Sequence, residues 1–338
     1  MRKRTWISVA VAVAAVAALL VTAYVRRNAA PEVARLLPDS DGIVFVNLKP
    51  LRALTRFGEH PVAHDADYQA FIDATGIEFE RDLDQAAFAL HRMANPNGPN
   101  GALAYSEVFR GRFDGPRLTG YLVAHAASHE RYAGHEIYSI PHEGRTVRVA
   151  VLGYDLVSVS NTPDDGPIHS IIDRYHASAS PFSGSALLSE YYHYVPLLSQ
   201  AWAIGRIGAP LSDAERFHVL GLAVPLPPDS TFIASVRYLG ALHVRIEEIA
   251  ASAQAASTSA QMATMVIAML RAAQISPDGG SEAVAAKEWN ELLSSAQVVR
   301  KDNHTVLKAK VPEALIQTLL QKPEAAAQSP SGSNPSLP

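Results

Sequence analysis

The chain has no cysteine among its 338 residues. Disulfides, thiolate metal sites and cysteine nucleophiles are therefore excluded. Large exported eukaryotic domains often contain disulfides, so their absence favours a protein of the bacterial envelope. An excess of positive charge is also missing, because 29 Lys and Arg stand against 33 Asp and Glu, for a net charge of −4. Since nucleic-acid binding needs a basic face, we expect no nucleic-acid partner.

Recognised catalytic and cofactor-binding motifs are missing as well. The sequence has no Gly-x-x-x-x-Gly-Lys phosphate loop, no Gly-x-Ser-x-Gly nucleophile elbow and no His-Glu-x-x-His zinc motif. Ser183-Gly184-Ser185 has the wrong spacing for the elbow. The sequence therefore assigns no catalytic residue, no cofactor-binding residue, no metal ligand and no cofactor. Because catalytic triads are defined by geometry, an extracytoplasmic hydrolase with a Ser/His/carboxylate site stays open as an alternative.

One long hydrophobic run stands near the N-terminus. Thr5 to Val25 carries no charge, and at 1.5 Å per residue it reaches about 31 Å, close to the hydrocarbon thickness of a bilayer. Basic residues precede the run at Arg2 to Arg4 and follow it at Arg26-Arg27. The positive charge on the short side predicts a cytoplasmic N-terminus. We therefore predict a single-pass anchor in the inner membrane, with the bulk of the chain periplasmic or otherwise extracytoplasmic.

Two alternatives to a single retained anchor arise. Val21-Thr22-Ala23 would allow signal-peptide cleavage before Tyr24 and release of the protein, but the run is longer than a usual signal core. A second uncharged stretch, Ile249 to Leu270, contains too many polar side chains for lipid and has apolar residues at helical spacing. We predict an Ala-rich core helix there. Its expected buried side consists of Met262, Met265, Val266, Met269 and Leu270.

Composition divides the chain into four parts. We predict a membrane segment at 1–28, a linker at 29–35, an extracytoplasmic α+β domain at 36–322 and a disordered tail at 323–338. The tail is rich in Pro, Ser and Ala and cannot bury enough apolar surface to fold.

Two stretches of the domain, about 36–127 and 226–322, are predicted to be related halves. Pro38-Asp39-Ser40 and Pro228-Asp229-Ser230 each introduce a strand-like run that is followed by Leu and an Ala-Leu pair. Both halves then have the predicted order β-α-β-β-α, which indicates an internal duplication.

In the second half we predict helices over Gly240–Ala273 and Glu282–Ser294, then strands at Ala296–Arg300 and His304–Ala309. The segment between the halves, 128–225, is predicted to be an insertion that begins with a β-meander. Its expected strands are His135–Ile140, Thr146–Leu152 and Leu156–Ser160. The fold class is thus α+β with a largely antiparallel sheet.

Two histidine pairs have the i, i+4 spacing that places both rings on one helix face, as a bound metal requires. They are His60 with His64 and His125 with His129. Pro61 opposes a regular helix through the first pair. Surface or capping histidines are the simpler interpretation of both pairs.

Four acids alternate at Glu78, Glu80, Asp82 and Asp84. They could place several carboxylates along one edge, where they would bind a cation or a basic partner. The segment lacks the calcium-loop pattern, and a solvated connection with acids at a helix start is the simpler interpretation.

Two further groups are weaker candidates. Arg110 and Arg112 end a predicted strand and could contact an anionic surface, although such residues usually face solvent. Tyr191, Tyr192 and Tyr194 could stack on a sugar or a peptide, although a helix packing face is the simpler interpretation.

Four segments carry a resemblance to known sequences: the strand led by Pro38-Asp39-Ser40, Leu48 to Arg52, Gly76 to Asp84, and Arg110 to Asp114. In these segments the chain resembles uncharacterised exported proteins of soil bacteria, acidobacteria in particular, that carry an N-terminal anchor and a duplicated α+β domain. The resemblance covers most of the stretch from Arg35 to Gln321. It implies location and architecture and transfers no active residue.

The sequence therefore predicts an envelope protein that is held in the bilayer through residues 5–25. We expect its outer domain to bind a ligand or an envelope protein partner without catalysis. The hydrolase is the alternative, and an assembly scaffold would need a large exposed apolar patch on the helix within 249–270.

Overall fold

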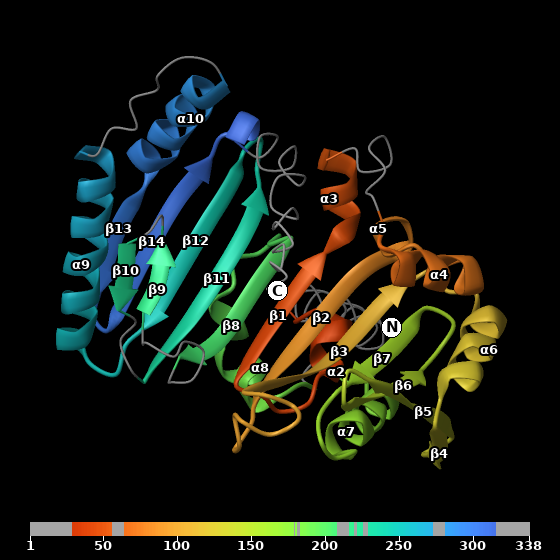
Figure 1. Cartoon of the computed structure of the whole chain (residues 1–338). Helices are drawn as coiled ribbons and strands as arrows, with labels where there is room; N and C mark the ends of the chain where they lie inside the picture. The colour runs from red at the N-terminus through yellow and green to blue at the C-terminus, as the bar shows by residue number, and fades with distance from the viewer. Residues whose placement is uncertain are drawn as a thin grey trace, which may run out of the picture.

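The computed structural model describes residues 29–55, 64–178, 180, 183–207, 216–219, 222–225, 229–272 and 281–315. These residues form a mixed α+β fold built on one large antiparallel sheet (Figure 1). The predicted fold class is confirmed at this level. The membrane segment 1–28, the tail 323–338 and His60 lie outside the described residues. Within the described ranges, no helix combines the length and the apolar character needed to span a bilayer.

The sheet has twelve strands among the described residues, and β8 and β1 are neighbours near its middle. From the centre to one edge the strands are β1 (Gly42–Asn47), β2 (Leu83–Arg92), β3 (Leu103–Gly111), β7 (Leu156–Ser160), β6 (Arg145–Val151), β5 (His135–His142) and β4 (Ser128–Tyr132). Towards the other edge they are β8 (Ala201–Ile207), β11 (Ser230–Tyr238), β12 (Leu242–Ile249), β14 (His304–Val311) and β13 (Gln297–Lys301). A separate hairpin pairs β9 (Arg216–Val219) with β10 (Leu222–Pro225).

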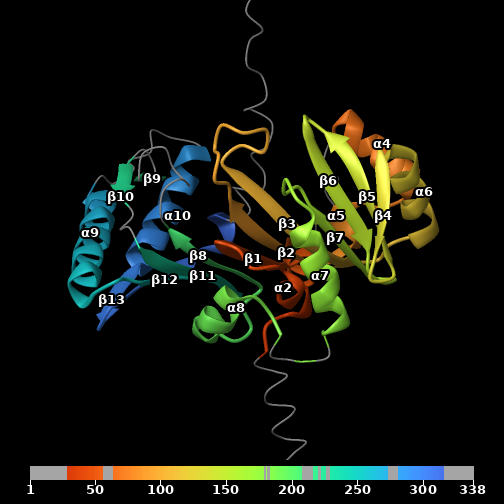
Figure 2. The ribbon, with the colours of Figure 1, turned by 90° about the horizontal axis from the view of Figure 1, so that it is seen from below.

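Helices cover both faces of this sheet. They are α2 (Glu32–Leu36), α3 (Leu48–Thr55), α4 (Ala66–Thr75), α5 (Phe79–Asp82), α6 (Gly115–His125), α7 (Gly166–His176), α8 (Ala186–Tyr191), the 3-10 turn η2 (Tyr192–Tyr194), α9 (Ala253–Ala272) and α10 (Ser281–Ser295). Helices α2, α7 and α8 lie on one face (Figure 2), where Ile43, Ile171 and Ile204 are fully or almost fully buried. On the other face α6 packs against β5 and β6, and α9 and α10 pack against β14 near the opposite edge.

The strands follow from alternating side chains and tight turns. On β1, Ile43 and Phe45 point into the same core, which is the period of two that a pleated strand imposes. Glu143 and Gly144 connect β5 to β6 with φ values of 49° and 76°, the left-handed conformation of a short hairpin turn. The predicted meander is confirmed, with β4 as a further strand that the sequence prediction missed. The hairpin β13–β14 is confirmed as well, with Asp302 at φ 53°.

The helix predicted from Gly240 is wrong over its first part, because Leu242–Ile249 is strand β12 and pairs with both β11 and β14. The order of the second half is therefore β-β-α-α-β-β, whereas the first half follows the predicted β-α-β-β-α. Apolar side chains do occur at every second position, Leu242, Val244 and Ile246, as in a strand, but the adjacent Glu247 and Glu248 interrupt this pattern. Both carboxylates are buried, at 4% exposure each, and both are hydrogen-bonded to neighbouring side chains.

The helix predicted in the second uncharged stretch is confirmed as α9, but its buried side is only partly the expected one. Met265 and Met269 are 58% and 52% exposed, and Ala256 faces the sheet instead. There the hydroxyl of Thr305 donates to the carbonyl oxygen of Ala256 at 2.9 Å. Small residues on the inner side let the helix approach the strands closely, so its larger methionines project outward.

Candidate functional site

A turn between two helices brings distant polar residues together. Asp65 caps α4 by accepting a hydrogen bond from the backbone N–H of Tyr68 at 2.8 Å. Gly76 ends α4 in the left-handed conformation, at φ 74°, and the chain reverses into α5. The reversal places the hydroxyl of Tyr68 2.7 Å from Oε2 of Glu80, to which it donates. The same hydroxyl accepts from the backbone N–H of Phe79 at 2.7 Å, so α4 and α5 are joined at this point.

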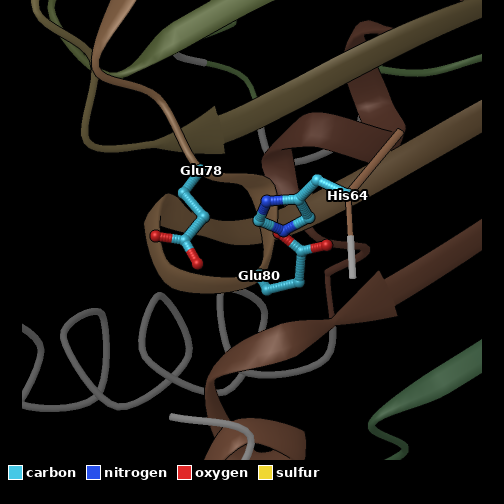
Figure 3. Close-up of side chains that lie close together, drawn as sticks. All are labelled: His64, Glu78 and Glu80. Atoms are coloured by element: carbon cyan, nitrogen blue, oxygen red, sulfur yellow. The ribbon is translucent and has the colours of Figure 1, made fainter. Parts of the chain in front are cut away.

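His64, Glu78 and Glu80 converge beside this junction (Figure 3). Each offers a ligand atom, and these atoms all lie within 4.8 Å of one another. Their side chains are partly buried, at 15%, 32% and 27% exposure. One member of the first predicted histidine pair therefore meets two of the four alternating acids. The sequence pointed to both groups separately, but not to their contact.

The other two acids are ion-paired to arginines and a lysine. Asp82 contacts Arg81 at 2.6 Å, and Asp84 contacts Arg52 at 2.6 Å and Lys49 at 2.9 Å. Burial opposes ionisation of both carboxyls, but hydrogen bonds and the neighbouring positive charges outweigh it and lower the pKa of each. Asp82 accepts from the backbone N–H of Glu78, as an acid near a helix start does, but it is only 7% exposed. Asp84 lies on β2, and its side chain is 19% exposed. The expected solvated connection is therefore wrong for these two residues.

The second histidine pair does not share a helix face. His125 closes α6 and hydrogen-bonds to the carbonyl oxygen of Tyr121 at 2.8 Å, while His129 lies on the exposed strand β4. Among the described residues, the other group with possible metal ligands is Glu130, Asp165 and His169.

A pocket of about 710 Å³ lies where β2 and β3 join and β7 ends. Its polar lining includes Asp41, His91, Arg92, Asn100, Thr162 and Asp164. Burial lowers the pKa of His91, and the charges of Asp41 and Asp164 only partly oppose that effect. Sequence patterns did not single out His91. The sequence did contain one indication that His91 faces the interior: it follows Ala87 and Ala89 with the period of two that places all three on one face of β2.

His91 begins a chain of hydrogen bonds that passes through two buried serines and returns to the pocket lining at Thr162 and Asp164. Its Nε2 lies 2.9 Å from the hydroxyl of Ser106, which lies 3.1 Å from that of Ser160. Ser160 in turn lies 2.8 Å from the hydroxyl of Thr162, and Thr162 donates to the carbonyl oxygen of Asp164. Each hydroxyl has one proton, and Thr162 uses its own on Asp164. Ser160 also lies 3.5 Å from the carbonyl oxygen of Tyr105, but its contact with Thr162 is much shorter, so Ser160 donates to Thr162 and accepts from Ser106. Ser106 then accepts from Nε2–H of His91.

The arginines and tyrosines that the sequence also suggested as candidates form ion pairs and packing contacts within the protein. Arg110 pairs with Glu32 at 2.9 Å and Asp155 at 3.1 Å. Arg112 lies 3.4 Å from Asp82. The three tyrosines of α8 and η2 pack against the core, as the packing interpretation predicts.

No protein-family model matches the chain, and no curated protein matches it significantly. Among solved structures the chain is similar to TP0453. The TM-score is 0.44 for crystal form III, with 10% identity over 86% of this chain and 98% of that one. Crystal form IV gives 0.44 at 10% identity over 87% and 97%, and crystal form I gives 0.43 at 8% identity over 86% and 96%. Similarity at this level transfers no residue and no activity.

Proposed function

We propose that the protein is a single-pass, membrane-anchored protein of the bacterial envelope whose outer domain binds a ligand without catalysing a reaction. The observation that carries this proposal is the uncharged run Thr5 to Val25 with basic residues on its short side. The resemblance to exported proteins with an N-terminal anchor supports the same location. The bilayer is then a partner through residues 5–25, and an envelope protein is a second possible partner of the domain.

The pocket beside His91 supports the binding role. Its volume of about 710 Å³ lies within the range of small-molecule sites. Asp41 and Asp164 bring negative charge to its lining, and Arg92 brings positive charge. These charged side chains would recognise polar or charged groups of a small ligand.

The burial of Ser106 and its hydrogen bond with His91 support a role without catalysis. This residue is 0% exposed, so a substrate cannot reach its hydroxyl. The direction of the hydrogen-bond chain also makes His91 the donor to Ser106, whereas a general base must accept the nucleophile's proton. The Ser–His contact of the described residues therefore lacks both access and the proton arrangement of a hydrolase.

Location is tested on intact cells. We expect added protease, after permeabilisation of any outer membrane, to degrade the domain while a tag placed before Arg2 stays protected. We also expect the full-length chain to fractionate with the inner membrane. A mature N-terminus at Tyr24 would instead support cleavage and release, and a soluble cytoplasmic protein would overturn the proposal.

The hydrolase alternative has its own test. We expect the purified protein to release no product from fluorogenic ester, peptide and glycoside substrates, and Ser106→Ala to behave as the wild type. Ser183→Ala, at a half-buried serine that accepts a hydrogen bond from Arg35, is the control. Turnover that falls at least about 1,000-fold in Ser106→Ala while Ser183→Ala keeps it would establish the hydrolase, because loss of a nucleophile has effects of that size.

We also propose an internal duplication, with the matching elements revised by the order of the sheet. Helix α2 leads into β1, α8 and η2 lead into β8, and these two strands pair with each other. Next to them lie the hairpins β2–β3 and β11–β12, followed by β7–β6 and β14–β13. The strand after Pro38 is thus matched by β8 rather than by the strand after Pro228.

A further inference from the structure

We propose that His64, Glu78 and Glu80 form a site for one divalent transition-metal ion, with Zn²⁺ as the ion that best suits its donor atoms. The site lies at the junction of α4 and α5, away from the pocket beside His91. It is independent of the binding role proposed above.

The protonation of His64 prepares one ligand. Its Nδ1 lies 3.4 Å from the side-chain oxygen of Gln69, an acceptor, and this contact favours the tautomer with the ring proton on Nδ1. The lone pair then lies on Nε2. That atom is buried and has no hydrogen-bond partner among the described residues. A buried polar atom without a partner is uncommon and costly, and a metal ion would satisfy it.

The carboxylate of Glu80 faces this lone pair. Its Oε2 lies 4.0 Å from Nε2 of His64, which is too long for a hydrogen bond but places a ligand oxygen on the correct side. Tyr68 holds the carboxylate by donating to Oε2 at 2.7 Å. Metal-ligating carboxylates and imidazoles generally have such outer hydrogen bonds.

Glu78 supplies the third ligand. Its Oε2 accepts from a guanidinium nitrogen of Arg81 at 3.0 Å. Arg81 also contacts Asp82 and the carbonyl oxygen of Gly76, so it keeps two partners when Glu78 turns towards an ion. The ligand atoms need only small movements, because bonds of about 2.0 Å require them to lie somewhat closer than they do now.

The donor set selects the class of ion. One imidazole with two carboxylates suits Zn²⁺ and its first-row neighbours, whereas Mg²⁺ and Ca²⁺ prefer oxygen ligands alone. Three protein ligands leave one position of a tetrahedral Zn²⁺ open, as in sites that bind a further ligand or water. The partial exposure of all three side chains gives the ion access.

The cluster of Glu130, Asp165 and His169 offers a contrast. There Nε2 of His169 already lies 3.1 Å from Glu130, and the ring stacks on Tyr132 at 3.8 Å between centroids. Its nitrogen is therefore engaged, and the cluster is explained by this contact beside an aromatic stack. His169 is a matched control for His64.

The experiment is calorimetric titration of Zn²⁺ into the full-length protein, kept in detergent and freed of metal with a chelator. We expect one Zn²⁺ per chain. His64→Ala and Glu80→Gln should each weaken binding by about 100-fold or more, and Tyr68→Phe, which removes an outer hydrogen bond, by about 10-fold. His169→Ala should bind as the wild type does.

If His64→Ala fails to fold, Glu80→Gln still tests the metal site. The introduced glutamine can accept the hydrogen bond from Tyr68, so this variant should fold, but it lacks the carboxylate ligand. Far-UV circular dichroism and thermal unfolding of each variant without metal establish that it is folded. Wild-type affinity in folded Glu80→Gln would overturn the proposal. So would Zn²⁺ binding that only His169→Ala removes, or a wild-type protein that binds no Zn²⁺.

Discussion

Replacement of Glu107 by Gln is expected to stabilise the protein by up to about 3 kcal/mol at pH 8, and by almost nothing at pH 4. Glu107 lies on β3 between Phe88 of β2 and Val159 of β7, its partners in register. Among the described residues it has no hydrogen-bond or ion-pair partner. Burial raises the pKa of Glu107 to about 7, because the carboxylate loses its hydration without gaining a compensating charge.

The pH dependence follows from the direction of this shift. A carboxyl whose pKa is higher in the folded than in the unfolded state binds its proton more tightly when folded. Its favourable contribution is complete below the unfolded pKa, about 4.3, and is lost as the pH rises through 7. Gln is uncharged throughout, so its advantage over Glu grows between these values and levels off above them.

Urea unfolding at pH 4, 5.5, 7 and 8 measures this effect for the wild type and Glu107→Gln. Glu136→Gln is the control, because the side chain of Glu136 on β5 is 42% exposed and only a long 3.9 Å ion pair joins it to Arg131. It should change the free energy of unfolding by less than about 0.5 kcal/mol at every pH. A difference between wild type and Glu107→Gln that does not depend on pH would contradict the expectation. It would mean that the carboxylate remains hydrated in the folded protein.

The sequence predicted the strands correctly where alternating apolar side chains and turn-forming residues indicate the same boundaries. The meander of β5, β6 and β7 and the hairpin β13–β14 have alternating side chains and turns that adopt positive φ, and both were predicted from the sequence. Strand β12 was not, because Glu247 and Glu248 lie in its interior, where polar residues argue against a buried strand. Their burial depends on Ser259 of α9 and His304 of β14, which are close only in the folded chain.

The candidate site was predicted in parts for the same reason. His64 was a candidate because it lies four residues after His60. Glu78 and Glu80 were candidates because acidic residues occur at every second position from Glu78 to Asp84. Their convergence depends on the left-handed conformation of Gly76 and on the hydroxyl of Tyr68, which joins two helices. A helix end at a glycine is readable from sequence, but the angle at which the next helix returns is set by packing.

The second large effect is expected at Trp202 on β8. This side chain is 3% exposed and stacks on Phe45 of β1, with 5.4 Å between ring centroids. On its other side it meets the edge of Tyr192 at 5.3 Å. Trp202→Ala should lower the free energy of unfolding by about 3–5 kcal/mol. The substitution leaves a cavity where the strands on the β1 side of the sheet meet those on the β8 side.

Urea unfolding followed by far-UV circular dichroism measures this loss and also tests the predicted single domain at 36–322. Because β8 pairs with both β1 and β11, the sheet is continuous through Trp202. We therefore expect one transition that moves as a whole to lower urea. Val299→Ala, 49% exposed on the edge strand β13, should move it by less than about 0.5 kcal/mol. Two transitions, of which Trp202→Ala shifts only one, would mean that the two sides of the sheet unfold separately.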